Sequence, residues 1–68
     1  MNELPDIGSL WMDDKHGLIA ITGCTQLATT GFNEILYTFH VLRVSDSFHT
    51  NGIFSISDWY GTFTCVSP

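Results

Sequence analysis

Residues 34–44 read Glu-Ile-Leu-Tyr-Thr-Phe-His-Val-Leu-Arg-Val, and this stretch decides the fold class. Its side chains fall into two alternating sets that are both largely apolar: Ile35, Tyr37, Phe39, Val41 and Arg43, and between them Leu36, Thr38, His40, Leu42 and Val44. Alternation with period two is typical of a strand, and two apolar faces indicate a strand that lies in the middle of a barrel or is covered on both sides. We therefore predict a central strand over residues 34–44.

The rest of the chain also favours strands. Thr, Ile and Val supply 17 β-branched residues and the aromatic residues another nine, so 26 of the 68 positions suit a pleated sheet. Turn-forming residues separate further strands, which we predict over residues 7–12, 17–22, 52–57 and 62–66. We expect a turn at 13–17, a long loop over 23–34, and a polar turn over 45–52 that ends in Asn51-Gly52. Residues 57–61 fit a single 3₁₀ turn.

Five short strands, a long early loop and a 3₁₀ turn before the last strand resemble the SH3-like barrel. The order and the lengths of the elements agree with that fold across residues 7–66. The resemblance implies an all-β, five-stranded SH3-like barrel, and an OB-like barrel is the alternative. With 68 residues, the chain is expected to form one small domain with an N-terminal arm over residues 1–6.

Charge and hydropathy exclude several classes of function. Seven acidic residues against Lys15 and Arg43 give a net charge of −5, which argues against binding to nucleic acid phosphates. We find neither a secretory signal nor an apolar run of about 20 residues, so we expect a cytoplasmic protein that binds no membrane. A short open reading frame of this kind is similar to those of bacteriophage accessory and virion proteins. The resemblance implies that the protein is located in the host cytoplasm or in the virion.

Cys24 and Cys65 are the only cysteines, and in the absence of an export signal we expect both to be reduced. The alternative is a disulfide that closes a loop of 40 intervening residues. Such a bridge stabilises a fold by about 3–4 kcal/mol where its geometry is allowed.

The sequence gives no support for a metal site or a catalytic site. His16, His40 and His49 lack the short paired spacing of metal ligands, so we expect no metal and no other cofactor. We find no nucleophile elbow and no glycine-rich phosphate loop, and a domain of this size has little room for a substrate pocket. We therefore expect no enzymatic activity. An enzyme would require an activated Cys24 or Cys65.

The nine aromatic residues exceed what such a small core can enclose, and aromatic residues in regions of low charge are typical of protein interfaces. The predicted binding residues are Trp11, Phe32, Phe48, Asp58, Trp59 and Tyr60. They indicate a non-enzymatic protein–protein interaction module that self-associates, assembles into a virion or inhibits a host protein. The alternative is a small-ligand-binding protein with an aromatic pocket, within one chain or between protomers. A cation cage of Trp59, Tyr60 and an acidic residue is one form of it.

Overall fold

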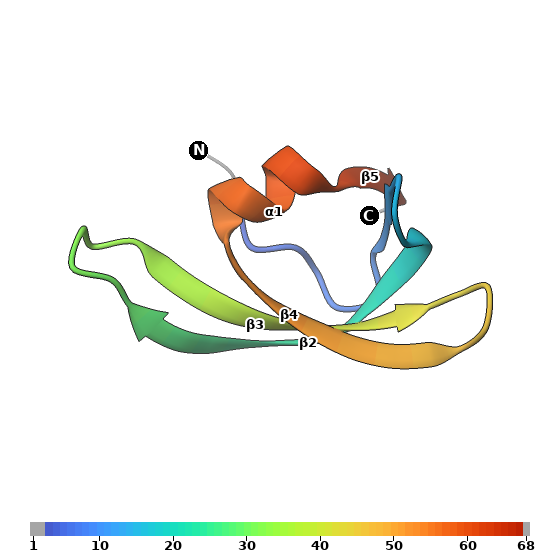
Figure 1. Cartoon of the computed structure of the whole chain (residues 1–68), viewed down its shortest axis with the longest axis horizontal. Helices are drawn as coiled ribbons and strands as arrows, with labels where there is room; N and C mark the ends of the chain where they lie inside the picture. Colours follow the sequence, from blue (N-terminus) through green and yellow to red (C-terminus); the bar gives the residue numbers. More distant parts are fainter. Residues whose placement is uncertain (1–2, 68) are drawn as a thin grey trace.

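The computed structural model describes residues 3–67 (Figure 1). Its elements follow in the order β1 (Leu10–Asp13), β2 (Gly17–Thr29), β3 (Ile35–Arg43), β4 (Phe48–Ser55), α1 (Ile56–Thr62) and β5 (Thr64–Ser67). The strands form one antiparallel sheet in the order β4-β3-β2-β1-β5. The prediction of an all-β fold is thus confirmed.

The predicted central strand is confirmed as β3. It pairs with β2 on one side and with β4 on the other, so both of its edges are occupied. Phe39 and Val41 are buried on its inner face, where they meet Ile19 and Ile21 of β2. The other face is not covered, since Leu36, Thr38 and Leu42 are half-buried and His40 is exposed.

The predicted loop over residues 23–34 is wrong, because β2 continues to Thr29 and only the short connection that follows it turns the chain. Two irregularities interrupt the pairing of β2 with β3, between Ile21 and Gly23 and between Gln26 and Ala28. Each inserts one extra residue and reverses the side-chain alternation beyond it. A strand with two such bulges shows no regular period in its sequence, which is why this half of β2 was missed.

The predicted turn at Asn51-Gly52 is also wrong. The chain turns between β3 and β4, where Ser47 has a φ of 56°, and Asn51 and Gly52 lie within β4. A Cβ atom at position 52 would lie 2.7 Å from Cε2 of Phe54, so any other residue here would force the Phe54 ring to shift. An Asn-Gly pair favours a turn locally, but here the ring of Phe54 occupies the space beside the glycine.

The segment before the last strand is a short α-helix and not the predicted 3₁₀ turn. Ser55 caps α1, because its hydroxyl oxygen accepts a hydrogen bond from the backbone N–H of Asp58 at 3.1 Å. At the other end, the N–H of Phe63 donates to the carbonyl of Trp59 at 2.9 Å. Two turns of helix bring Trp59 and Phe63 onto the same side, toward the sheet.

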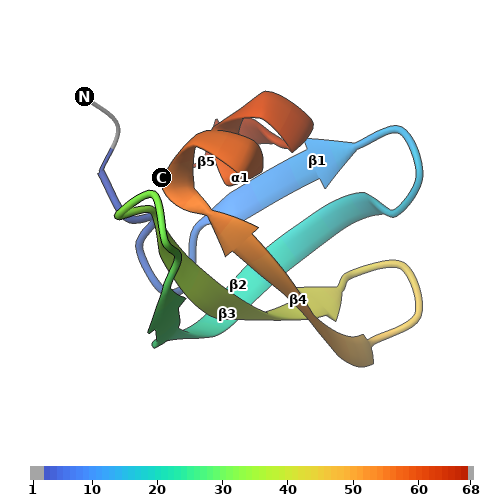
Figure 2. The same ribbon diagram turned by 60° about the vertical axis from the view of Figure 1, so that its left-hand side comes forward.

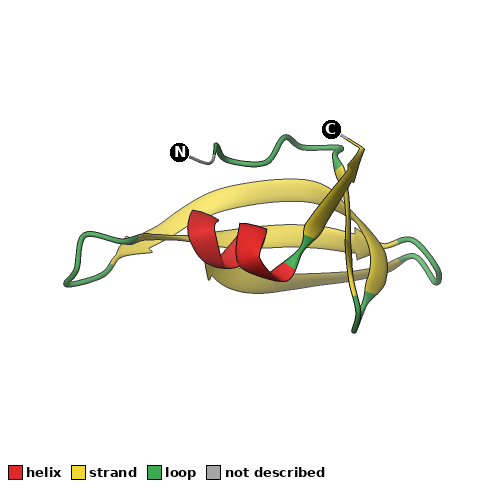
Figure 3. Ribbon diagram, turned by 90° about the horizontal axis from the view of Figure 1, so that it is seen from above, coloured by secondary structure: helices red, strands yellow, loops and turns green. Residues whose placement is uncertain are grey.

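The sheet is open within residues 3–67, so the prediction of an SH3-like barrel is not confirmed. The first residues of β2 pair with β1, while most of the strand pairs with β3, so β2 connects the two parts of a strongly curved sheet (Figure 2). α1 lies over the concave face of this sheet in Figure 1, and Figure 3 shows the helix across the sheet from above. The core fills the space between them and consists of Trp11, Ile19, Ile21, Phe39, Val41, Trp59 and Phe63.

Candidate functional site

Two of the six predicted binding residues, Trp11 and Trp59, lie in the core and not on the surface. Trp59 is fully buried, and Phe39 and Phe63 stack on its two faces with ring centroids 4.4 and 4.1 Å away. Trp11 meets Trp59 edge to face, and its indole N–H donates to the hydroxyl of Ser9 at 2.8 Å. A core with few aliphatic side chains therefore uses its large aromatic rings to fill its volume.

The predicted cation cage at residues 58–60 does not form. A cation binds to the face of an aromatic ring, and both faces of Trp59 are covered. Tyr60 is half-buried against Trp11, and its hydroxyl donates to the carbonyl of Glu3 at 2.9 Å. The side chain of Asp58 is exposed in the first turn of α1, where a negative charge favours the helix.

The other two predicted residues are exposed, but they lie at opposite ends of β3. Phe32 is 95% exposed in the connection between β2 and β3. This connection forms the left-hand end of the molecule in Figure 1. Phe48 is half-exposed at the start of β4, beyond the other end of β3. The two rings therefore do not form one aromatic surface.

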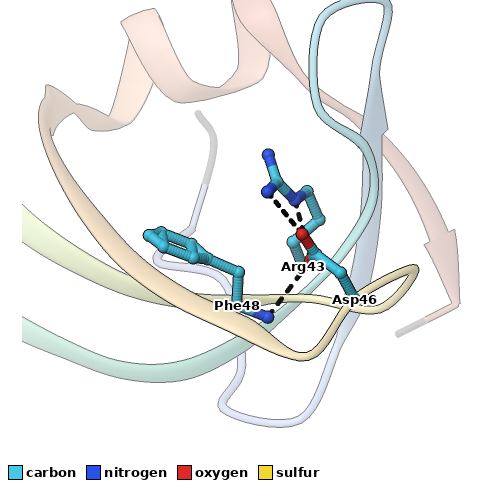
Figure 4. Close-up of polar contacts among 3 residues, drawn as sticks. All are labelled: Arg43, Asp46 and Phe48. Atoms are coloured by element: carbon cyan, nitrogen blue, oxygen red, sulfur yellow. Dashed lines mark hydrogen bonds and ion pairs between the residues drawn. The ribbon is translucent and has the colours of Figure 1, made fainter.

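Phe48 belongs to a polar cluster that fixes the start of β4 (Figure 4). The guanidinium of Arg43 donates to both carboxylate oxygens of Asp46, at 2.9 and 2.6 Å, and lies 5.2 Å from the centre of the Phe48 ring. Asp46 also accepts a hydrogen bond from the backbone N–H of Phe48 at 3.2 Å. The Arg43 hydrogen bond lowers the pKa of Asp46, so the carboxylate stays charged over a wide pH range.

β4 is an open edge of the sheet, which the sequence did not reveal because Asn51-Gly52 suggested a turn. The strand has eight residues, and its pairing with β3 is regular throughout. Residues 48–55 contain no Lys, Arg, Asp, Glu or Pro. On its other side β4 pairs with no strand in the described part of the chain. Its backbone N–H and C=O groups are thus available to another chain.

A hollow of about 90 Å³ lies behind the β4 edge. Its rim includes the half-buried His16 and the exposed Thr50 and Asn51, while its floor is formed by buried core residues. One floor residue, Trp59, has an indole Nε1 that is buried and has no hydrogen-bond partner within residues 3–67. A buried donor without a partner costs about 1–3 kcal/mol relative to one that is hydrogen-bonded.

A wider hollow of about 520 Å³ lies between the β2–β3 connection and the start of α1. Ile35, Tyr37 and Ile56 contribute its apolar part, and Glu34 adds a carboxylate. Phe32 lies in the same connection but does not line this hollow. The hollow therefore does not unite the exposed aromatic residues into one site.

The thiols and histidines are dispersed. Cys24 is half-buried and Cys65 is exposed, and both are free. Burial raises the pKa of the Cys24 thiol above its ordinary value, which opposes formation of the reactive thiolate. Across residues 3–67, no group of three or more His, Cys, Asp or Glu side chains is placed to hold a metal ion.

Comparison with protein-family models, with curated proteins and with solved structures finds no match for this chain. In the described part of the chain, no helix has the length and apolar character needed to cross a membrane. The candidate site is the β4 edge and the hollow behind it.

Proposed function

We propose that this protein is a non-enzymatic protein–protein interaction module that binds another chain by strand addition at β4. In this mode an extended segment pairs with an exposed sheet edge, and main-chain hydrogen bonds supply much of the affinity. The observation that carries the proposal is the length, regularity and lack of charge of β4. Phe48 and Ile53, both more than half-exposed on this strand, add apolar contact area.

The proposal includes the assignment of the fold as an SH3-like barrel that is open at β4. The strand order, the long bent β2 and the helical segment between β4 and β5 support this assignment. The expectation of a bacteriophage protein in the host cytoplasm or the virion belongs to the same proposal. Its partner is then a second copy, a virion component or a host protein.

The first occupant to test is a second copy, because each copy offers the same edge and two edges pair about a twofold axis. The net charge of −5 opposes association, but β4 itself carries no charged residue. Salt screens the repulsion between exposed charges that lie more than about 10 Å apart. We therefore expect the affinity to persist or to increase at high salt.

The test compares lysine substitutions on the two edges of the sheet. Ile53 on β4 is 58% exposed and Val66 on β5 is 52% exposed, so the two side chains are well matched. A lysine on an edge strand opposes strand addition. In sedimentation equilibrium at micromolar concentration, we expect wild type and Val66→Lys to associate equally, and Ile53→Lys to be monomeric.

A hetero-complex is tested with the same variants in affinity capture from the source cell. We expect wild type and Val66→Lys to retain the same protein, and Ile53→Lys to lose it. The proposal fails if wild type is monomeric and captures no protein, or if the two lysine variants have equal effects in both experiments.

A further inference from the structure

The wider hollow, between the β2–β3 connection and the start of α1, supports an inference that is independent of strand addition at β4. Its volume of about 520 Å³ lies within the range of about 300–1,000 Å³ that is usual for small-ligand sites. Its apolar part comes from Ile35, Tyr37 and Ile56, and the polar residues around them include Glu34. Apolar walls with a few polar groups are the usual form of such a site.

Backbone contacts hold both walls of the wider hollow in place. In the β2–β3 connection, the N–H of Thr30 donates to the carbonyl of Glu34 at 2.8 Å, and the N–H of Asn33 donates to the carbonyl of Thr30 at 3.0 Å. The hydroxyl of Thr30 accepts a further hydrogen bond from the N–H of Glu34 at 3.2 Å. The other wall begins at Ser55, which pairs with Leu36 of β3 and caps α1. A ligand therefore meets a site that needs little ordering, which favours binding.

The charges around the wider hollow favour a cation. Glu34 is the only charged residue that lines it, and its carboxylate forms no ion pair within residues 3–67. The two basic residues lie elsewhere, because Lys15 is in the turn between β1 and β2, and Arg43 is bound to Asp46 at the other end of β3. On the second wall, the exposed Asp58 in the first turn of α1 offsets the positive end of the helix dipole. A cationic ligand would thus supply a countercharge, whereas an anion would be repelled.

Tyr37 supplies the aromatic part of the wider hollow. Its ring is half-buried, and the nearby ring of Phe39 is tilted by 57° at a centroid distance of 6.2 Å. Within residues 3–67, no aromatic ring is stacked on Tyr37, in contrast to Trp59, which has a ring on each face. Tyr37 therefore remains free to pack against the apolar body of a ligand.

We infer that the wider hollow binds a small organic cation, whose ammonium group pairs with the Glu34 carboxylate and whose apolar body packs against Tyr37. Ile35 and Ile56 extend the apolar surface. A primary ammonium group is only a hydrogen-bond donor, and the hydroxyl of Ser57, which also lines the hollow, is an acceptor for it. Primary amines that carry one aromatic ring on a short alkyl chain fall in this class.

The test compares three probes that share a benzyl body and differ in charge: benzylammonium, benzyl alcohol and phenylacetate. Each is added to the ¹⁵N-labelled full chain at pH 7 and low ionic strength, and the backbone N–H signals are followed by NMR. We expect the signals of Glu34, Tyr37 and Ile56 to move in a saturable manner, and those of Phe48 and Thr50 to stay in place. Benzylammonium should bind about threefold more tightly than benzyl alcohol, because an exposed ion pair contributes a factor of this order. Phenylacetate should bind most weakly, and added salt should reduce the differences.

A matched pair of variants tests the role of Glu34. Glu34→Gln and Asp14→Asn each remove one negative charge from an exposed residue, but Asp14 lies in the β1–β2 turn and does not line the wider hollow. We expect Glu34→Gln to bind benzylammonium and benzyl alcohol with equal affinity, and Asp14→Asn to keep the wild-type preference. The inference is overturned if wild type binds benzylammonium no more tightly than benzyl alcohol, if the signals around the hollow do not move, or if the two variants have the same preference.

Discussion

The sheet ends in β4 on one side and in β5 on the other, and the two edges are built differently. β5 has four residues, and its pairing with β1 shifts register between Leu10 and Trp11. β4 has eight residues and pairs with β3 without a shift. Short length and irregular pairing are common means of protecting an edge from other strands. β5 has both, and β4 has neither.

The difference follows from what each strand contributes to the core. All four residues of β5 are exposed, so the strand can be short without loss of packing. β4 contributes Phe54, which packs against Phe39, Trp59 and Phe63, and Gly52, over which the Phe54 ring lies. A long, regular edge is therefore a consequence of how this small core is filled.

Replacing Phe39, the buried ring that packs against Phe54 of β4, should have the largest effect on stability. Phe39 is fully buried between Trp59, Phe54 and Tyr37, and Phe→Ala in a core costs about 3–5 kcal/mol. This is a large part of the stability of a small domain, so we expect Phe39→Ala to be largely unfolded. Urea unfolding followed by tryptophan fluorescence measures the loss. The control Phe32→Ala, at a 95% exposed site, should change the free energy of unfolding by less than about 0.5 kcal/mol.

If Phe39→Ala instead has nearly the wild-type free energy of unfolding, the packing of β4 does not depend on the Phe39 ring. Its length would then have another cause, and the proposed link between the core and the open edge would be wrong.

A smaller effect is expected where β4 itself is overpacked. Gly52→Ala places a Cβ atom 2.7 Å from the Phe54 ring, so that ring must move. Overpacking of this kind costs about 1–3 kcal/mol. The matched control is Gly61→Ala in α1, where nothing lies within 4 Å and alanine favours the helix by up to about 1 kcal/mol. Differential scanning calorimetry should show a lower Tm for Gly52→Ala and an unchanged or higher Tm for Gly61→Ala. Equal shifts in the two variants would contradict the packing role of Gly52.

Gly52 also shows why the sequence predicted the fold class but not the edge. The alternation of residues 34–44 correctly indicated a central strand, although only one face of β3 carries buried residues. The Asn51-Gly52 pair predicted a turn, whereas both residues lie within β4. The glycine serves a contact with Phe54, and such a contact becomes visible only when the strands are placed together.

The predicted site residues were also limited by what composition alone can show. The abundance of aromatic residues was evident in the sequence, but their sorting into core and surface was not. Trp59 lies in a segment that resembles a surface turn, and the helix turns it into the core. The missed signal was the alternation of Phe48, Thr50, Gly52 and Phe54 across an uncharged stretch, which is typical of a strand.

The turn next to β5 should respond to acid. Asp13 ends β1 and is largely buried, which by itself raises the pKa of its carboxyl group. Hydrogen bonds from the ring and the backbone of His16 outweigh this effect and hold the pKa below its ordinary value. A lowered folded-state pKa contributes stability above the unfolded-state pKa of about 3.9, and that contribution is lost as the pH falls through the folded-state pKa.

We therefore expect Asp13→Asn to cost about 1 kcal/mol at pH 7 and to cost less as the pH falls below about 4. Urea unfolding across this range gives the difference directly. A penalty that is constant with pH would show that the carboxylate charge does not stabilise this turn.

The smallest effect is expected at the β5 edge, where chemical modification should not change association. We expect Cys65 and Cys24 to be reduced, so the intact mass without reductant should show no loss of two hydrogens. Cys65 is exposed on β5, whereas Cys24 is half-buried and burial raises its pKa, so iodoacetamide should alkylate Cys65 first. Because the proposed contact uses β4, the alkylated protein should have the association constant of the unmodified protein in sedimentation equilibrium. If alkylation of Cys65 dissociates the complex while Ile53→Lys does not, the short edge is the one in use, and length and regularity of a strand do not decide which edge binds.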